Sequence, residues 1–317
     1  KADGRYVPLA MSGSESWVAS ELGFQNIGPN YWKGEDGRLA LIAGQERLDN
    51  PQYVKVFEEL ARWRAYLGEG GEGRDYATTN ELFTSGKAAF YAAGSWEIAP
   101  FTGKVDFGVM RPPVAKQGDG CFFTDHTDIG MGMNPASKNK EAAMTFLQWL
   151  TTSQFAELYT NSLPGFFSLS NHFFEATNPA AKEMMEWRDQ CDSTIRVATQ
   201  ILSRGTPKLG DELAEVSQGV LLGTMAPQAA ADRLEQGLKG WYAPHQSQQV
   251  KALDCQCAAP AAVSAAPATV ESVIAAPSAA ISTELNASPV PAAVAPSAAA
   301  STDVEQALAS ELEAPQP

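Results

Sequence analysis

The sequence contains no uninterrupted apolar run of about 18 residues, the length that a membrane-spanning helix needs, so we expect no transmembrane helix. The basic and apolar segments that open a signal peptide are also missing from its start. Basic residues are in the minority, with 23 Lys and Arg against 37 Asp and Glu, for a net charge of -14. This balance disfavours nucleic acid as a partner, because phosphates require a basic surface.

Catalytic motifs are equally scarce. The chain has three His residues and no G-x-S-x-G, H-E-x-x-H or Walker lysine motif. The glycine-rich stretch 68–73 follows a predicted helix rather than a strand, which argues against a phosphate-binding loop. A glycosidase would need two carboxylates across a cleft, and Glu15 with Asp125 or Asp128 are the formal candidates. We expect a protein that is not an enzyme and carries no cofactor.

Four cysteines are present, and their spacing does not match a metal site. Cys121 and Cys191 stand singly and far apart, whereas Cys255 and Cys257 form a C-x-C pair directly before Ala258. Free thiols and a Cys121–Cys191 disulfide are both open at this point, the second in an oxidising compartment. No metal is expected.

The C-terminal part of the chain differs sharply in composition from the rest. From Ala258 to Pro317 it is mainly Ala, Pro, Ser and Val, without any aromatic, Lys, Arg or Gly residue. Such a segment cannot bury a bulky apolar face. We therefore predict a globular region over 1–242 and a disordered tail over 243–317.

Periodicity within the globular region predicts an α/β protein. We expect strands near 6–11, 87–93, 105–110 and 128–133, the second of them buried, and a turn or hairpin over 30–37. The pair Asn50-Pro51 is a typical helix start for a helix over 51–67. Further helices are expected over 17–22, 139–152, 153–160, 179–190, 192–203, 211–223 and 227–240, with a short one after Asn80.

Aromatic residues follow several predicted strands at loop positions. Trp17 comes after Ser14 and Glu15, Trp96 follows Gly94-Ser95, and Phe166 follows Gly165. Side chains at such positions point into a cleft at the end of a sheet. Sugars need flat rings for their C–H faces and carboxylates or amides for their hydroxyl groups. The pattern favours a carbohydrate ligand, although core packing remains the alternative for each Trp.

Two segments resemble the sugar-binding proteins of bacterial ABC importers, the solute-binding protein family 1, maltodextrin-binding-protein-like group. The first is Leu82–Phe90 followed by Gly94-Ser95-Trp96, which is similar to the F-x-x-G-K-A-A-M…G-x-W stretch of that family. The second is Gly132–Thr151, with its Asn-Pro-Ala-Ser-Lys-Asn-Lys-Glu-Ala-Ala core. The similarity runs from about Lys1 to Tyr242.

The resemblance implies a type II periplasmic-binding-protein fold, mainly its C-terminal lobe with an incomplete N-terminal lobe. It also implies a monomer outside the cytoplasmic membrane that closes on a sugar and docks on the permease subunits of an ABC importer. Two alternatives remain: an interaction or scaffold protein built from a retained lobe, and a truncated fragment without function. The ligand-binding residues that the resemblance and the loop positions indicate are Ser14, Glu15, Trp17, Ser95, Trp96, Asp125, His126, Asp128, Gly165 and Phe166.

Overall fold

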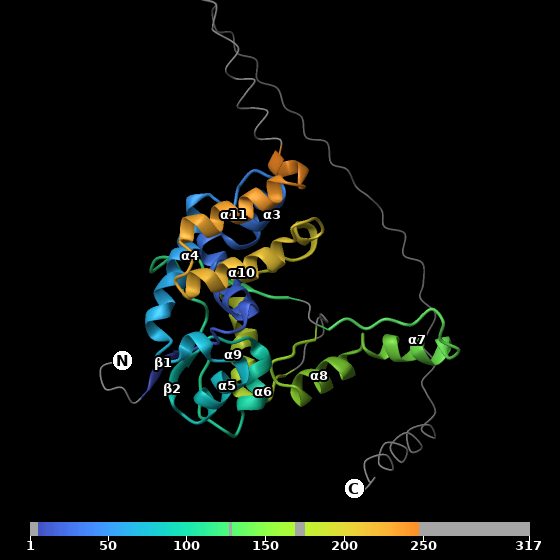
Figure 1. Ribbon diagram of the computed structural model, residues 1–317. Coiled ribbons are helices and arrows are strands. Elements are labelled where there is room, and N and C mark those ends of the chain that lie inside the picture. The colour runs from blue at the N-terminus through green and yellow to red at the C-terminus, as the bar shows by residue number, and fades with distance from the viewer. Residues whose placement is uncertain (1–5, 127–128, 169–174, 247–317) are drawn as a thin grey trace, which may run out of the picture. The chain divides into compact units, whose positions relative to one another are not determined.

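The computed structural model describes residues 6–126, 129–168 and 175–246 (Figure 1). Two pairs of parallel strands are present in this part of the chain. β1 (Val7–Ala10) pairs with β2 (Ala88–Tyr91), and β3 (Phe122–Thr124) pairs with β4 (Asp192–Thr194). Parallel partners require long crossover connections, and here the crossovers contain helices. The α/β class predicted from the sequence is confirmed.

The helices occupy most of the remaining described residues. The first is a π-helix, η1 (Val18–Phe24). The α-helices are, in chain order, α1 (Gln25–Ile27), α2 (Pro29–Trp32), α3 (Gly34–Ile42), α4 (Pro51–Trp63), α5 (Tyr76–Thr84), α6 (Ile98–Phe101), α7 (Lys140–Trp149), α8 (Ser153–Ser162), α9 (Pro179–Glu186), α10 (Leu209–Leu221) and α11 (Pro227–Lys239). Short 3-10 helices lie between them: η2 (Arg64–Tyr66), η3 (Gly71–Gly73), η4 (Ser95–Glu97), η5 (Trp187–Asp189) and η6 (Gln200–Ser203).

Helix starts follow the side chains that the sequence supplies. α4 begins with Pro51 at its first position, where the missing N–H costs nothing, and its preceding Asn50 has the extended backbone of an N-cap without making the capping hydrogen bond. At α5 the cap is made, because the Asp75 carboxylate accepts a hydrogen bond from Thr78 N at 2.7 Å. Asn178 caps α9 in the same way. α5 thus starts ahead of Asn80, where the sequence pattern places a helix start.

The main hydrophobic core is built from two segments that lie far apart in the sequence. All of its members fall within residues 11–67 and 197–238. α10 packs on the π-helix η1, on α4 and on α11, as Figure 1 also shows for the three α-helices. Completely buried side chains such as Phe57, Leu60 and Leu213 fill the contact. This packing forms the body on which the candidate site is placed.

Two predicted elements were replaced by elements of another kind, for identifiable reasons. Residues 30–37 form parts of α2 and α3 rather than a hairpin, and the two helices are separated by Lys33 in a left-handed conformation, with φ 65°. The helix predicted over 192–203 is largely absent, because Asp192–Thr194 hydrogen-bonds to β3 as strand β4. A helical spacing of apolar residues does not reveal that a strand partner is available. The helix expected over 17–22 is longer than predicted, because η1 runs through Gly23 and is followed directly by α1.

Apolar side chains remain exposed on the segment from Met110 to Leu163. Residues 105–110 and 129–133 form no strand, and β2 is only half-buried, with Phe90 57% exposed. α7 has the predicted bounds within a few residues but contains no buried residue, and its Phe146 is 49% exposed. An apolar run becomes a strand only where a neighbouring strand accepts its backbone hydrogen bonds. The described residues provide none for these two runs.

The β3–β4 pair is fixed to the helical body from both sides. The Asn30 amide donates to Phe122 O at 2.9 Å and accepts from Phe122 N at 2.8 Å. Thr194 of β4 donates to the Glu35 carboxylate of α3 at 2.7 Å, and the neighbouring Arg38 guanidinium lowers the pKa of Glu35. A Cys121–Cys191 disulfide closes the start of the pair. The second of the two cysteine alternatives is the one observed.

The packed region continues past Tyr242, where the sequence composition placed the boundary of the tail. His245 is buried, with its Nδ1 3.1 Å from the Glu235 carboxylate and its Nε2 2.7 Å from Leu41 O. Residues 247–317, which hold most of the predicted tail, lie outside the described residues. Within the described ranges, no helix has the length and apolar character that crossing a bilayer would require.

Removing the disulfide should lower stability measurably. The bond joins residues 70 positions apart, and a crosslink over a loop of this size contributes about 2–4 kcal/mol, chiefly by restricting the unfolded chain. The Cys121→Ser/Cys191→Ser variant should therefore unfold at a clearly lower urea concentration. The Cys255→Ser/Cys257→Ser variant is the control and should unfold at the wild-type midpoint. An unchanged midpoint for the first variant would contradict the assigned pairing.

Candidate functional site

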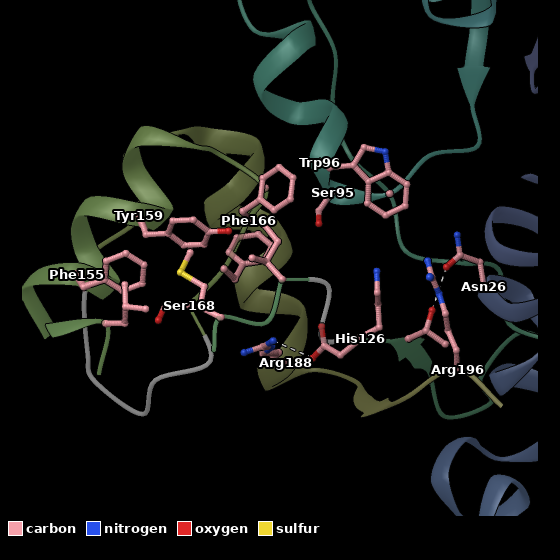
Figure 2. Close-up of a pocket in the computed structure, with 18 of the residues that line it drawn as sticks. Asn26, Ser95, Trp96, His126, Phe155, Tyr159, Phe166, Ser168, Arg188 and Arg196 are labelled. Atoms are coloured by element: carbon pink, nitrogen blue, oxygen red, sulfur yellow. Dashed lines mark hydrogen bonds and ion pairs between the residues drawn. The ribbon is translucent and has the colours of Figure 1, made fainter. Parts of the chain in front are cut away.

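A cavity of about 610 Å³ lies where the ends of β2 and β3 meet the loop after α8 (Figure 2). Its size falls within the range of about 300–1,000 Å³ that small-molecule sites occupy. The side chains come from five separate parts of the chain. They are Leu22, Asn26, Gly94, Ser95, Trp96, Thr124, Asp125, His126, Ile129, Met131, Leu150, Thr151, Phe155, Tyr159, Gly165, Phe166, Phe167, Ser168, Arg188 and Arg196.

The loop after β2 supplies one side of the cavity. Ser95 and Trp96 stand in the short helix η4, directly after the extended Gly94. Gly165, from the loop after α8, packs against this turn so closely that a Cβ at its position would stand 1.8 Å from Ser95 O. Gly165 also has a φ of 101°, which side chains with a Cβ rarely adopt. The two predicted loops are therefore in direct contact.

The end of β3 supplies the polar side. Thr124 donates to the Asn26 side chain at 3.1 Å, and the Asp125 backbone donates to Thr194 O at 2.7 Å, so the strand pairing continues into the cavity wall. The His126 ring stands perpendicular to the Trp96 ring, with centroids 6.1 Å apart. In Figure 2, His126 and Trp96 lie on the same side of the cavity. Both side chains are partly buried.

Aromatic side chains of α8 and its following loop form the opposite side (Figure 2). The Phe155 and Tyr159 rings stack with centroids 5.2 Å apart, since residues four positions apart share one face of a helix. Tyr159 also contacts Phe166 edge-on at 6.4 Å. The cavity thus has flat apolar surfaces on one side and Trp96 with polar groups on the other.

Both arginines of the cavity are paired with carboxylates. Arg188 of η5 donates to Asp125 at 2.8 Å, and both side chains are more than one third exposed. Arg196 Nε lies 2.7 Å from the Glu21 carboxylate of η1, as an ion pair that lacks the alignment of a hydrogen bond. Burial raises the pKa of Glu21, and the Arg196 charge opposes that rise. The guanidinium charges are therefore largely balanced within the protein.

Six of the residues singled out from the sequence line the cavity: Ser95, Trp96, Asp125, His126, Gly165 and Phe166. Ser14, Glu15 and Trp17 do not. Glu15 instead accepts a hydrogen bond from Ser12, while Trp17, 38% exposed, packs on Tyr76 with ring centroids 5.1 Å apart. Asp128 lies outside the described residues.

Sequence reasoning missed the contributions of the helices. Phe155 and Tyr159 occupy a predicted helix, and their four-residue spacing indicates a shared face without telling whether that face meets a core or a cavity. Asn26, Arg188 and Arg196 carry no motif at all. Only the fold brings them to the ends of β3 and β4. Among the described residues, no three or more His, Cys, Asp or Glu side chains come together as metal ligands would.

Comparison with known proteins agrees with this architecture. Residues 1–157 match the family of bacterial extracellular solute-binding proteins. The matched residues make up about half of the chain, and this half is similar to that family. The relationship to bacterial solute-binding proteins inferred from the sequence motifs agrees with this match, and the fold is the type II periplasmic-binding-protein fold.

Several solved structures share the fold of this chain at low sequence identity. A chitin oligosaccharide binding protein is 20% identical, with a TM-score of 0.61, and the alignment covers 80% of this chain and 62% of the other. A sugar transporter from Bacillus licheniformis, solved with stachyose, is 16% identical with a TM-score of 0.58 over 74% of this chain and 61% of its own. A bacterial solute receptor with a preference for β-D-galactopyranose is 20% identical, with a TM-score of 0.56 and coverages of 75% and 62%.

The chain spans about three fifths of the length of each of these structures. At such identities the likeness establishes the fold, and any ligand of this chain has to be argued from its own cavity.

Replacing Gly165 by Ala should displace the loop that forms part of the cavity. The left-handed backbone alone costs a residue with a Cβ about 1–2 kcal/mol, and the contact with Ser95 O adds about 1–3 kcal/mol of overpacking. Gly103→Ala is the matched control, because Gly103 has a φ of 79° but a methyl group added there would meet no atom within 4 Å. Urea unfolding should show the larger loss for Gly165→Ala; equal losses would contradict the close contact.

Proposed function

We propose that this protein captures a neutral carbohydrate for import by an ABC transporter. The observation that carries the proposal is the cavity itself, which places aromatic rings opposite polar groups at the ends of β2 and β3. The family and the sugars named for the similar structures support the same ligand class. Capture rather than reaction is the function that we assign.

The lining suits a pyranose ring. The Trp96 indole and the rings of Phe155, Tyr159 and Phe166 offer flat apolar surfaces for C–H groups. The Asn26 amide, the Ser95 hydroxyl and the Asp125–Arg188 pair supply donors and acceptors for hydroxyl groups. Several modest contacts must act together, since one stacked ring contributes only about 0.5–1.5 kcal/mol beyond burial.

The charge pattern favours a neutral sugar over an acidic one. An anionic ligand would need an unpaired guanidinium, whereas Arg188 is bound to Asp125 and Arg196 faces Glu21. A carboxylate group in the ligand would also meet the negative charge of Asp125 at the polar side. Hydroxyl groups, in contrast, can share the donors and acceptors of an existing ion pair.

The mode of action that we propose follows from the two-sided lining. A sugar that contacts both sides binds the closed arrangement more tightly than the open one, so it shifts the population toward closure. The closed protein would then dock as a monomer on the permease subunits of its importer, at the outer face of the cytoplasmic membrane. The permease partner, the location and the closure belong to the proposal.

Substitution of Trp96 tests the sugar site directly. Ligand-observed NMR detects weak complexes, and stachyose, galactose and chitotriose serve as probes. Trp96→Ala should weaken binding of the preferred sugar about tenfold, because stacking and burial of the indole are lost. Trp96→Phe should keep part of the affinity, since a ring remains.

Trp63→Ala is the control, because Trp63 packs on the core outside the cavity. Absence of binding by all three sugars, or binding that ignores Trp96→Ala, would refute a carbohydrate site in this cavity.

Asp125→Asn tests the charge argument. The substitution frees the Arg188 guanidinium, so the affinity for galacturonate should rise relative to that for galactose by up to about fivefold, the range of exposed charge pairs. Asp189→Asn removes the same charge next to Arg188 without touching the cavity lining and should leave the ratio unchanged. Equal responses of the two variants would show that the Asp125–Arg188 pair does not select against anions.

A further inference from the structure

The indole N–H of Trp96 is already used inside the protein. Trp96 Nε1 donates a hydrogen bond to the Tyr76 hydroxyl at 2.8 Å. Tyr76 is the first residue of α5 and does not line the cavity, whereas Trp96 does. A single N–H cannot be given in full to a second acceptor. Trp96 therefore presents its ring faces and carbon edge to the cavity while its polar edge points away from it.

The Tyr76 hydroxyl is in turn held by a buried carboxylate. It donates to Glu97 Oε1, and Glu97 is only 4% exposed. The other carboxylate oxygen accepts from the Asn80 amide at 3.2 Å, and Asn80 Oδ1 accepts from the Tyr91 hydroxyl. These four hydrogen bonds, from Trp96, Tyr76, Asn80 and Tyr91, all run toward Glu97. Such chains polarise one another, which strengthens each hydrogen bond.

The surroundings of the two phenols keep them protonated, as this direction of donation requires. Burial, assisted by the hydrogen bond to Glu97, raises the pKa of Tyr76 well above its usual range. Burial also raises the pKa of Tyr91. Both hydroxyl groups thus stay protonated at every physiological pH and remain donors. On its other side the Tyr76 ring packs against Trp17.

A carboxylate buried among neutral phenol and amide groups is costly for stability. The hydrogen bonds of Glu97 explain why a carboxylate is found there. Glu97 directly follows Trp96 in η4, and its side chain accepts the hydrogen bond of the Tyr76 hydroxyl, which in turn holds the indole N–H. We propose that Tyr76 and Glu97 are positioning residues that fix the Trp96 ring so that only its apolar surface meets the ligand. This inference rests on the proposed function for the identity of the ligand, but the orientation of the ring is independent of it.

The experiment has a readout without ligand and one with it. In ¹⁵N-indole spectra, the Trp96 N–H signal is assigned by its loss in Trp96→Phe. Tyr76→Phe should move this signal upfield and speed its exchange with water, because the acceptor is gone. Glu97→Gln, which keeps an acceptor for the Tyr76 hydroxyl, should shift it less than Glu97→Ala. Tyr242→Phe is the matched control, since it deletes a phenol bonded to Ile42 O elsewhere.

Sugar affinity is then measured in a double-mutant cycle with stachyose, galactose and chitotriose. Tyr76→Phe should weaken binding about fivefold, the effect of one hydrogen bond, and should have no further effect in the Trp96→Phe background. An equal loss in both backgrounds would show that Tyr76 contacts the sugar itself and would overturn the proposal. An unchanged indole signal in Tyr76→Phe would overturn it as well.

The two hypotheses fail in different ways. If the wild-type chain binds none of the three sugars, the proposed function is wrong, and the indole signal still decides whether Tyr76 and Glu97 hold the ring. Should Tyr76→Phe not fold, the comparison of Glu97→Gln with Glu97→Ala gives the same decision, because Glu97 reaches the indole N–H through the Tyr76 hydroxyl.

Discussion

One side-chain amide connects the helical body to the polar wall of the cavity. Asn30, buried at the start of α2, makes both a donor and an acceptor contact with the backbone of Phe122. It thereby adds a second backbone partner to β3, which is three residues long and otherwise pairs only with the equally short β4 among the described strands. Thr124, Asp125 and His126 follow within four residues of that anchor. Their position in the cavity depends on it.

Core and cavity are built from different parts of the chain. The core comes from residues 11–67 and 197–238 and is densely filled, whereas most cavity residues come from 94–96, 124–131, 150–168 and 188–196. The latter segments also leave apolar side chains in contact with water, among them Met131 and Leu158. The residues that form the core and most of those that line the cavity thus come from separate parts of the sequence. Cavity loops in such an arrangement can vary while the core that supports them stays the same.

The elements that depend on neighbouring residues alone could be predicted from the sequence. The strand near Val7, the helix after Pro51 and the loop with Trp96 follow from spacing and from residues that begin or end an element. The strand β4 could not be foreseen, since its partner β3 lies about 70 residues away. Trp17 and Trp96 looked alike in sequence, but only Trp96 faces the cavity, because Tyr76 stands between them. Arg188 and Phe155 reach the cavity through tertiary contacts that no short motif encodes.

The disulfide has a topological consequence for the aromatic side of the cavity. Cys121 and Cys191 bracket α7, α8 and α9, so the segment that carries Phe155, Tyr159 and Phe166 forms a covalently closed ring of polypeptide rooted at β3 and β4. A protease that cuts once inside this ring produces two chains that stay linked, and the severed ends remain tethered beside the body. Breakdown of the aromatic side therefore takes two events, a cut and a reduction, rather than one.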